Sequence, residues 1–262
     1  LRSQNKFLAC ACIPVNNMEI TLNQENLVTK SVLATVVEMN NLSQSVLELV
    51  LQCETLISFY AAQSVLLLNS ENTGGKFLIS SPSSAKATGK IEVHVDRSSN
   101  STFSQWLKND LTIGGKLNAC FVGGEVFYVP GQFNQPLLLV GWQSGLSAII
   151  GVIQDIFEFN HSGSVYLFHS VDTHESLYFE PELKQICDYY PNFHYIPCAE
   201  TGINPTNGYT GNVNEIIPKI LPKLANWKVF LCGTRDQAHG LQRYAYLAGA
   251  SMKDIYLEVI SR

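Results

Sequence analysis

The chain has few charges and no run of one sign. Only 15% of its 262 residues are charged, and the formal net charge is −5. Nucleic acids and anionic membrane surfaces attract clustered lysine and arginine, so the absence of a basic run argues against both as main partners. No apolar run reaches the roughly 20 residues that a membrane-spanning helix needs. We therefore expect neither nucleic-acid binding nor a membrane span.

The cysteines do not form a disulfide pattern. There are seven, an odd number scattered along the chain: Cys10, Cys12, Cys53, Cys120, Cys187, Cys198 and Cys232. This usage suits free thiols in a reducing compartment, so we expect a cytoplasmic protein. The 46% hydrophobic content predicts an ordered protein with one large core or two ordinary ones. The sequence starts at Leu1 and its first methionine is Met18, so we expect a fragment of a longer protein.

The most informative stretch is Pro136–Phe159. Its first five residues, Pro136–Val140, form an apolar run typical of a strand buried on both faces. Gly141 and Gly145 then bracket a turn, and from Leu146 onward apolar residues recur every three or four positions, as on a helix. The N–H groups at a helix start lack partners and attract negative charge. The stretch predicts contact with a nucleotide phosphate; the alternative is a strand–turn–helix unit that binds nothing.

The part of the chain before this stretch has the pattern of a small antiparallel barrel. Short segments rich in Val, Ile and Leu are separated by turn residues, and one helix is expected at Thr102–Asn109. The expected strands are Ser31–Val37, Val46–Leu51, Ser64–Leu68, Phe77–Ile79, Ile91–Val95, Lys116–Val122 and Glu125–Val129. The turn clusters include Asn72–Gly75, and Val129–Pro136 is the expected linker to the next domain.

After the linker, strands and helices alternate. The expected strands are Leu137–Val140, Val165–Phe168, Phe193–Pro197, Lys228–Leu231 and Ile255–Val259, and the clearest helices are Leu146–Phe159, Val213–Leu224 and Arg235–Ala248. This order predicts a doubly wound parallel sheet of five strands with right-handed crossovers. The turns at Gly141–Gly145, His169–Glu175 and Cys232–Arg235 should then share the rim at the carboxyl ends of the strands, where such sheets bind ligands.

A β-barrel followed by an α/β domain, with particular motifs in both, resembles the ferredoxin–NAD(P) reductase superfamily. The matching segments are Phe59–Gln63, Lys76–Pro82, Asn100–Leu107, Gly141–Ala148, Val165–Ser170, Val229–Gly233 and Leu257–Val259. The tail FLACAC is similar to the end of a plant-type ferredoxin domain, with the fourth cluster cysteine at Cys10. The resemblance is thus to the oxygenase reductases. It implies the end of a ferredoxin-like domain at residues 1–22, a flavin-binding barrel at 23–133 and an NAD-binding domain at 134–262.

The resemblance implies a flavin-dependent reductase. Electrons would pass from NADH through FAD or FMN to an iron–sulfur domain or an oxygenase component, with a [2Fe–2S] cluster on an upstream domain. The implied cofactor-binding residues are Lys76, Phe77, Leu78, Ser80, Ser81 and Ser104 for the flavin and Gly141, Ser144, Gly145, Asp172, Gly233 and Thr234 for the nucleotide. Cys232 and Phe77 are the implied catalytic residues, and Cys10 is the implied metal ligand of a full-length chain. An acidic residue at position 172 favours NADH over NADPH.

The chain departs from the family motifs in both domains. In the flavin motif, Gly75 takes the place of a phosphate-binding arginine, although Lys76 could substitute, and Leu78 takes the place of a hydroxyl residue. In the nucleotide turn, Trp142 and Gln143 replace small residues. These departures keep a second hypothesis open: a non-catalytic module that retains the reductase fold for docking or regulation.

Two smaller groups have simpler interpretations. Asp172, His174 and Glu175, with His169, suggest a metal site, but three ligands so close together on one loop rarely converge without a fourth. We interpret this loop as facing the adenosine ribose of the nucleotide. His94 lies within an expected strand and is interpreted as structural, while Trp142 and Gln143 are candidates for the rim of the site.

Overall fold

The computed structural model describes residues 31–97, 101–124, 126–202 and 206–260. The expected ferredoxin-like tail at Leu1–Leu22, with Cys10 and Cys12, lies outside the described residues. Within the described ranges, no helix is both long enough and apolar enough to cross a membrane.

The first half folds as one antiparallel sheet that is curled like a barrel. Its strand order is β4-β3-β6-β1-β2-β5. An isolated bridge between Ile79 and Val93 brings the two edge strands together, although the sheet does not close. The bounds are β1 (Ser31–Asn41), β2 (Val46–Cys53), β3 (Ser64–Leu68), β4 (Gly74–Leu78), the 3₁₀ helix η4 (Ser83–Ala87), β5 (Lys90–Asp96), α1 (Thr102–Asn109) and β6 (Lys116–Gly123). The predicted antiparallel barrel-like domain is confirmed.

Alternation of side chains explains the core of this half. Leu47, Leu49 and Leu51 of β2 point inward, as do the apolar residues at alternate positions of β5. The amphipathic helix α1 covers this core with Phe103 and Leu107. The intervening side chains of β2 and β5 are therefore free to face the second half of the molecule.

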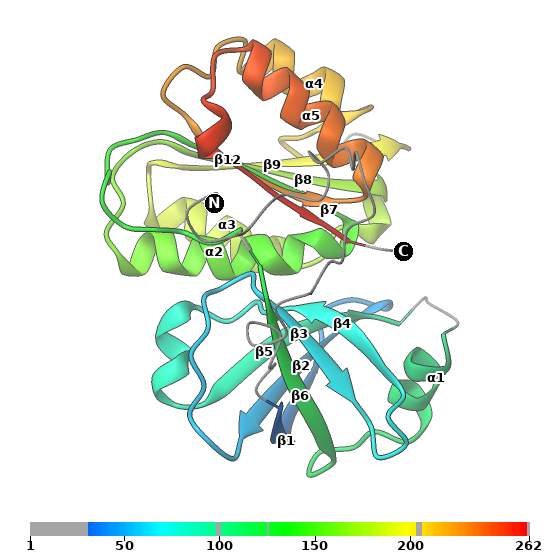
Figure 1. The fold of residues 1–262 in the computed structure, drawn as a ribbon. Helices are drawn as coiled ribbons and strands as arrows, with labels where there is room; N and C mark the ends of the chain where they lie inside the picture. The colour runs from blue at the N-terminus through cyan, green and yellow to red at the C-terminus, as the bar shows by residue number, and fades with distance from the viewer. Residues whose placement is uncertain (1–30, 98–100, 125, 203–205, 261–262) are drawn as a thin grey trace, which may run out of the picture.

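The second half is a doubly wound parallel sheet, as predicted, with strand order β10-β9-β8-β7-β11-β12. Helices α2 and α3 cover the face toward the barrel, and α4 and α5 cover the other face (Figure 1). The bounds are β7 (Leu137–Trp142), η5 (Gln143–Gly145), α2 (Leu146–Glu158), β8 (Val165–Thr173), η6 (His174–Ser176), α3 (Glu180–Tyr189), β9 (Phe193–Thr201), β10 (Tyr209–Thr210), α4 (Val213–Ile220), β11 (Lys228–Gly233), α5 (Arg235–Leu247), η7 (Met252–Asp254) and β12 (Ile255–Val259).

Four details differ from the prediction. The strand expected at Glu125–Val129 is not formed over 126–129. The turn expected at Asn72–Gly75 is shorter, because Gly74 and Gly75 already pair with β3. Helix α4 ends at Ile220 rather than Leu224, since a residue that precedes a proline, here Leu221, disfavours the helical conformation. The two-residue strand β10 adds a sixth strand to the parallel sheet.

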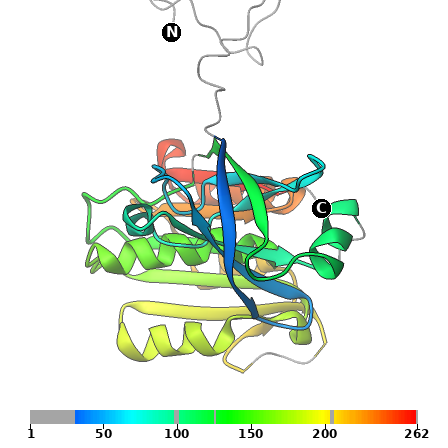
Figure 2. The ribbon, with the colours of Figure 1, turned by 90° about the horizontal axis from the view of Figure 1, so that it is seen from below.

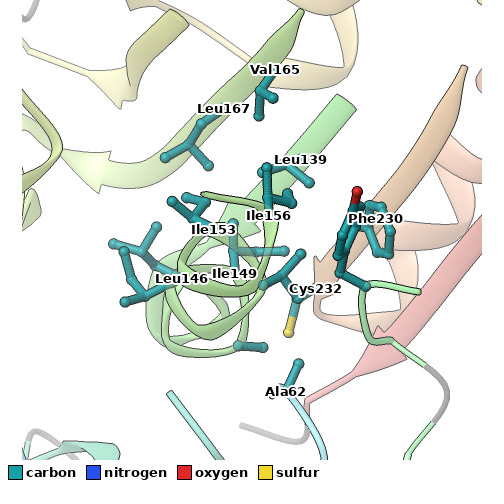
Figure 3. Packing of buried hydrophobic residues seen from close by; sticks show 14 of the residues in the cluster. Ala62, Leu139, Leu146, Ile149, Ile153, Ile156, Val165, Leu167, Phe230 and Cys232 are labelled. Atoms are coloured by element: carbon teal, nitrogen blue, oxygen red, sulfur yellow. The ribbon is translucent and has the colours of Figure 1, made fainter. Parts of the chain in front are cut away.

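One hydrophobic core crosses the boundary between the two halves. It joins Ala62 and Leu78 of the barrel to Leu139, Leu146 and Cys232 of the parallel sheet and its helix (Figure 3). Figure 2, viewed from the barrel side, shows the barrel strands lying across α2 and the sheet beneath it. This shared core places the rim of the parallel sheet next to β3 and β4 of the barrel.

Candidate functional site

The turn between β7 and α2 leaves an open helix start. Helix α2 continues the 3₁₀ helix η5, and neither N-cap residue, Trp142 or Gly145, has a side chain that accepts a hydrogen bond from the helix N–H groups. The first turns of η5 and α2 contain no acidic residue. The turn therefore offers backbone N–H groups and the positive end of the helix dipole to an anion. Ser144 and Gly145, two predicted nucleotide-binding residues, lie in this turn, and Gly141, a third, lies just before it near the end of β7.

Close packing fixes the turn against the end of β11. A Cβ atom on Gly145 would lie 2.2 Å from the carbonyl oxygen of Cys232 and 3.3 Å from its Sγ. Only glycine allows this approach without displacing the backbone. The structure thus brings together two of the three turns that were expected to share a rim. The uncapped backbone N–H groups of the turn are donors of the kind that a pyrophosphate accepts from.

The two bulky residues of the turn behave differently from each other. Trp142 is a buried core residue rather than a rim residue, because the alternation of β7 directs it with Val140 toward α4 and α5. Its ring packs on Gly233, where a Cβ would lie 2.7 Å from Trp142 Cε3. Gln143 has φ of +51°, a left-handed conformation that favours glycine. The bulky Trp142 is thus accommodated in the core, whereas Gln143 leaves the backbone of the turn strained.

The end of β11 carries a buried thiol. Cys232 is fully buried, and burial raises its pKa far above the usual range, so the thiol is neutral at physiological pH. Thr234, the N-cap of α5, forms a capping box with Gln237, whose Oε1 accepts from Thr234 N at 3.4 Å and from Thr234 Oγ1 at 2.8 Å. The start of α5 is therefore capped by its own residues, and the turn before α2 is the more open of the two helix starts at this rim.

An ion pair joins the barrel to the C-terminal strand beside Cys232. Lys76 Nζ of β4 lies 3.0 Å from Glu258 Oε1 of β12, and Ser64 Oγ of β3 lies 3.5 Å from the same oxygen. Glu258 is the register partner of Cys232 in the parallel sheet. Glu258 was not among the predicted site residues; its signal in the sequence was the acidic residue in the C-terminal strand. The predicted flavin-binding Lys76 thus reaches the predicted nucleotide domain.

The predicted flavin segment places its side chains in contrasting surroundings. Phe77 is half-buried, with its ring centroid 5.9 Å from that of Phe103. Leu78 is buried in the core between the two halves. Ser80 Oγ is buried without a hydrogen-bond partner, whereas Ser81 Oγ accepts a hydrogen bond from Glu92 N at 3.2 Å. The unpartnered Ser80 Oγ is thus an orphaned buried polar atom next to α2, the kind of group that a bound ligand can satisfy.

The phosphate end of a flavin finds fewer partners. Gly75 has no side chain, and Ser104 uses its backbone N–H and its hydroxyl within the start of α1: Ser101 Oγ accepts from Ser104 N at 3.1 Å and donates to Ser104 Oγ at 2.9 Å. At these two positions a phosphate would therefore find only the proton of the Ser104 hydroxyl as a donor.

The loop after β8 reaches the barrel, which the sequence did not predict. Tyr178 is buried, and its hydroxyl lies 3.5 Å from His94 Nδ1 of β5. On its other side the Tyr178 ring meets the ring of His169 edge-on at 5.5 Å. The apolar β-strand context of His94 gave no sign of this contact; Tyr178 itself stands next to Phe179, an aromatic pair in a loop. Asp172 lies just before this loop, exposed near the end of β8.

The histidine of this region is not placed for metal binding. Burial lowers the pKa of His169 to about 3, so its ring is neutral, and its Nδ1 lies 3.3 Å from Tyr195 Oη. The side chain points into the protein, away from the exposed Asp172. Across the described ranges, no three His, Cys, Asp or Glu residues lie close enough together to hold a metal ion.

Comparisons with known proteins agree with this geometry. Residues 139–242 match the family model described as the oxidoreductase NAD-binding domain. The chain is 29% identical over 243 residues to the phenol hydroxylase P5 protein of Acinetobacter pittii, covering 88% of this chain and 68% of the relative. It is 23% identical over 195 residues to an NAD(P)H-flavin reductase of Vibrio harveyi, covering 73% and 81%.

A solved structure shares the fold. The ferredoxin reductase in carbazole 1,9a-dioxygenase superposes with a TM-score of 0.76 and 16% identity, covering 88% of this chain and 69% of that one. The fold and the resemblance predicted from the sequence are therefore confirmed.

Proposed function

We propose that this ferredoxin reductase-like chain, an NAD(P)H-dependent flavoprotein oxidoreductase, takes electrons from NADH and delivers them through a flavin to an iron–sulfur domain or an oxygenase component. The phenol hydroxylase protein and the flavin reductase among its relatives support this reading. Of the residues that carry the proposal, the barrel supplies Lys76, Phe77 and Ser80. The parallel sheet supplies the turn at Gly141–Gly145 and the end of β11.

The observation that carries the proposal is the open turn before α2, packed directly on the Cys232 end of β11. A dinucleotide whose pyrophosphate lies on this turn has its nicotinamide within reach of the β11 end, because the two elements are in contact at Gly145. Asp172, exposed near the carboxyl end of β8, is the proposed partner of the adenosine ribose, which favours NADH.

The side chains around the proposed nicotinamide position, at the end of β11, bind the ligands and shield them from water rather than react with them. Cys232 keeps its proton at physiological pH and acts as a small neutral contact. Leu78, Leu146 and Tyr178 exclude water from the space between the two halves, because all are buried in one core. At the edge of this space, the ion pair of Lys76 and Glu258 holds β4 and β12 together. When bound, a flavin supplies the conversion between the two-electron donor NADH and one-electron acceptors.

The acceptor and the location belong to the proposal as well. A [2Fe–2S] domain upstream of residue 23, with Cys10 as its last ligand, is the proposed electron acceptor, and the proposed location is the cytoplasm. The phenol hydroxylase P5 protein among the relatives supports an acceptor of this kind.

Spectroscopy tests the proposal directly. The purified chain, incubated with FAD or FMN and desalted, should keep a yellow flavin spectrum or, if binding is weak, show saturable binding by equilibrium dialysis. NADH added without oxygen should bleach that spectrum, and ferricyanide should restore it. A chain that binds no flavin under these conditions contradicts the proposal.

A second function has its own support. Gln143 sits in a strained turn, and Leu78 offers no hydroxyl at the domain interface, so a non-catalytic docking module with the reductase fold remains the alternative. Leu78→Ser combined with Gly75→Arg separates the two. Flavin binding that is present only in the double variant would identify the natural chain as the docking module, whereas binding by the parent chain supports the reductase.

A further inference from the structure

The parallel sheet has a cavity at the end opposite the nucleotide turn. Its volume is about 540 Å³, and it lies among the loops that precede β7, β11 and β12. We propose that this cavity binds a neutral, hydroxyl-rich small molecule, a sugar or a polyol. Strand β7 spans roughly 20 Å, so the cavity is distinct from the turn before α2 at the other end of that strand. The proposal therefore does not depend on the binding of a flavin or a nucleotide.

The lining of the cavity is rich in side-chain amides. Gln132, Asn134 and Gln135 come from the loop before β7, and Asn226 comes from the loop before β11. Ser251, from the loop before β12, adds a hydroxyl. A carboxamide both donates and accepts hydrogen bonds, and a hydroxyl does the same. Several such groups around one space suit a ligand that itself carries several groups able to donate and accept.

One lining group lacks a partner inside the described part of the chain. Gln135 Oε1 is buried and accepts no hydrogen bond from any residue that the structure describes. A buried acceptor without a donor is costly, so a ligand that brings a donor is favoured at this position. A ligand hydroxyl can donate to Oε1, and it can also accept from the Nε2 end of the same amide. A fully ionised oxyanion such as sulfate offers acceptors only and leaves Gln135 Oε1 without a donor.

The charges of the lining cancel each other. Among the described residues around the cavity, Lys253 and Asp254 are the two charged ones, and they are neighbours in η7. An anion would meet the carboxylate of Asp254 and a cation the ammonium of Lys253, so neither sign is favoured. Pro136 supplies the one apolar side chain among the same described residues, so a hydrophobic ligand finds little matching surface. A neutral polar ligand is the class that remains.

Packing holds the loop before β7 in place. A Cβ atom on Gly163 would lie 2.7 Å from the carbonyl oxygen of Asn134 and 2.7 Å from that of Gln135. At the end of the same loop, the carbonyl oxygen of Pro136 accepts from Lys228 N of β11 at 3.0 Å. The amides of this loop are therefore in position before a ligand arrives, which lowers the entropy cost of binding.

Two-dimensional ¹H–¹⁵N NMR of the whole chain tests the proposal, with D-glucose and myo-inositol as neutral probes. At least one of them should shift the backbone amides of Gln135, Asn226 and Ser251 in a saturable way, with a Kd on the order of 1–10 mM. Glucose 6-phosphate and glucosamine add a negative and a positive charge, and each should bind about fivefold more weakly than the better neutral probe. The proposal is overturned if neither neutral probe shifts these amides in large excess, or if a charged analogue binds more tightly.

Two variants test the lining itself. Gln135→Met keeps the length of the side chain and removes the amide, so it should raise the Kd of the neutral probe about tenfold. Ser251→Ala, at an exposed position, should raise it about threefold and gives a second measurement if Gln135→Met disturbs the fold. Gln185→Met, an exposed glutamine on α3 outside the cavity, is the matched control and should leave the Kd unchanged. An unchanged Kd in both test variants, or an equal rise in the control, would overturn the proposal.

Discussion

Asp155 of α2 accepts two hydrogen bonds from Ser83 of the barrel, from its backbone N at 2.7 Å and from its Oγ at 2.5 Å. Asp155 is completely buried, and Ser83 Oγ also accepts from Ala61 N at 3.0 Å. A buried carboxylate with both oxygens occupied joins two domains by specific polar contacts within an otherwise apolar interface. The position of the predicted flavin segment relative to the nucleotide turn therefore depends on the hydrogen bonds between Asp155 and Ser83.

Replacing Asp155 by alanine should lower the free energy of unfolding by about 2 kcal/mol, because the Ser83 N–H is left buried without an acceptor. The measurement is urea denaturation followed by far-UV circular dichroism. Glu158→Ala is the matched control on the same helix. Its hydrogen bond to Ser84 Oγ, 2.8 Å long, is exposed, so we expect a change within about 0.5 kcal/mol. Equal losses in both variants would contradict the role given to Asp155.

Asp155 should also make stability depend on pH. Burial raises its pKa, against the opposing effect of the Ser83 hydrogen bonds and with smaller contributions from Glu158 and Lys86. A carboxyl whose folded pKa lies above its unfolded value of about 3.9 stabilises the fold fully below that value. This stability is lost as pH rises through the folded pKa.

The comparison with Asp155→Asn isolates this effect, since asparagine does not titrate. The difference in unfolding free energy, wild type minus Asp155→Asn, should fall as pH rises from about 4 toward 7. Urea midpoints at several pH values measure it. A difference that grows with pH would mean that the Ser83 hydrogen bonds outweigh burial.

Gly145→Ala tests the contact between the nucleotide turn and β11. The added Cβ would lie 2.2 Å from the Cys232 carbonyl oxygen, so the backbone has to move. We expect a loss of about 1–3 kcal/mol in unfolding free energy and a raised KM for NADH. Gly240→Ala is the control, because its Cβ would meet only the side-chain end of Asn214 at 2.8 Å, and alanine favours the helix. An unchanged KM in Gly145→Ala would separate the turn from nucleotide binding.

Gln143→Gly should relieve the strained turn. A non-glycine residue in the left-handed region costs roughly 1–2 kcal/mol, part of which the greater freedom of glycine in the unfolded chain offsets. We expect a net gain of about 0.5–1 kcal/mol by urea denaturation. Gln143→Ala keeps the strain and should give no such gain. A gain of the same size in both variants would point to the lost side chain rather than to φ of +51°.

Local sequence patterns were enough to predict the helices and strands but not the contacts between the two domains. The predicted bounds of Ser64–Leu68 and Thr102–Asn109 agree with β3 and α1 residue for residue, since each depends on the spacing of nearby side chains. The Asp155–Ser83, His94–Tyr178 and Lys76–Glu258 contacts join residues 72, 84 and 182 positions apart. Periodicity carries no information over such separations.

The same limit explains the misplacement of Trp142. Its place in a motif suggested the rim, but strand alternation continued two residues past the expected end of β7 and turned the side chain into the core. The backbone strain at Gln143 could not be predicted from the sequence either, because its φ is set by how the turn packs on β11 rather than by the residue type.

Cys232→Ser tests whether the buried thiol contributes to hydride transfer or only to packing. Serine keeps the size of the side chain but places a hydroxyl in an apolar core, so we expect a loss of about 1–3 kcal/mol in stability. If Cys232 contacts the nicotinamide, kcat with NADH and ferricyanide should also fall about tenfold, which corresponds to about 1.4 kcal/mol in the barrier. Cys198→Ser is the control, because Cys198 is equally buried on β9 of the same sheet, three strands away from β11, and burial raises its pKa to about 12. It should lose similar stability and keep its kcat. A parallel fall of kcat in both variants would assign Cys232 to the core alone.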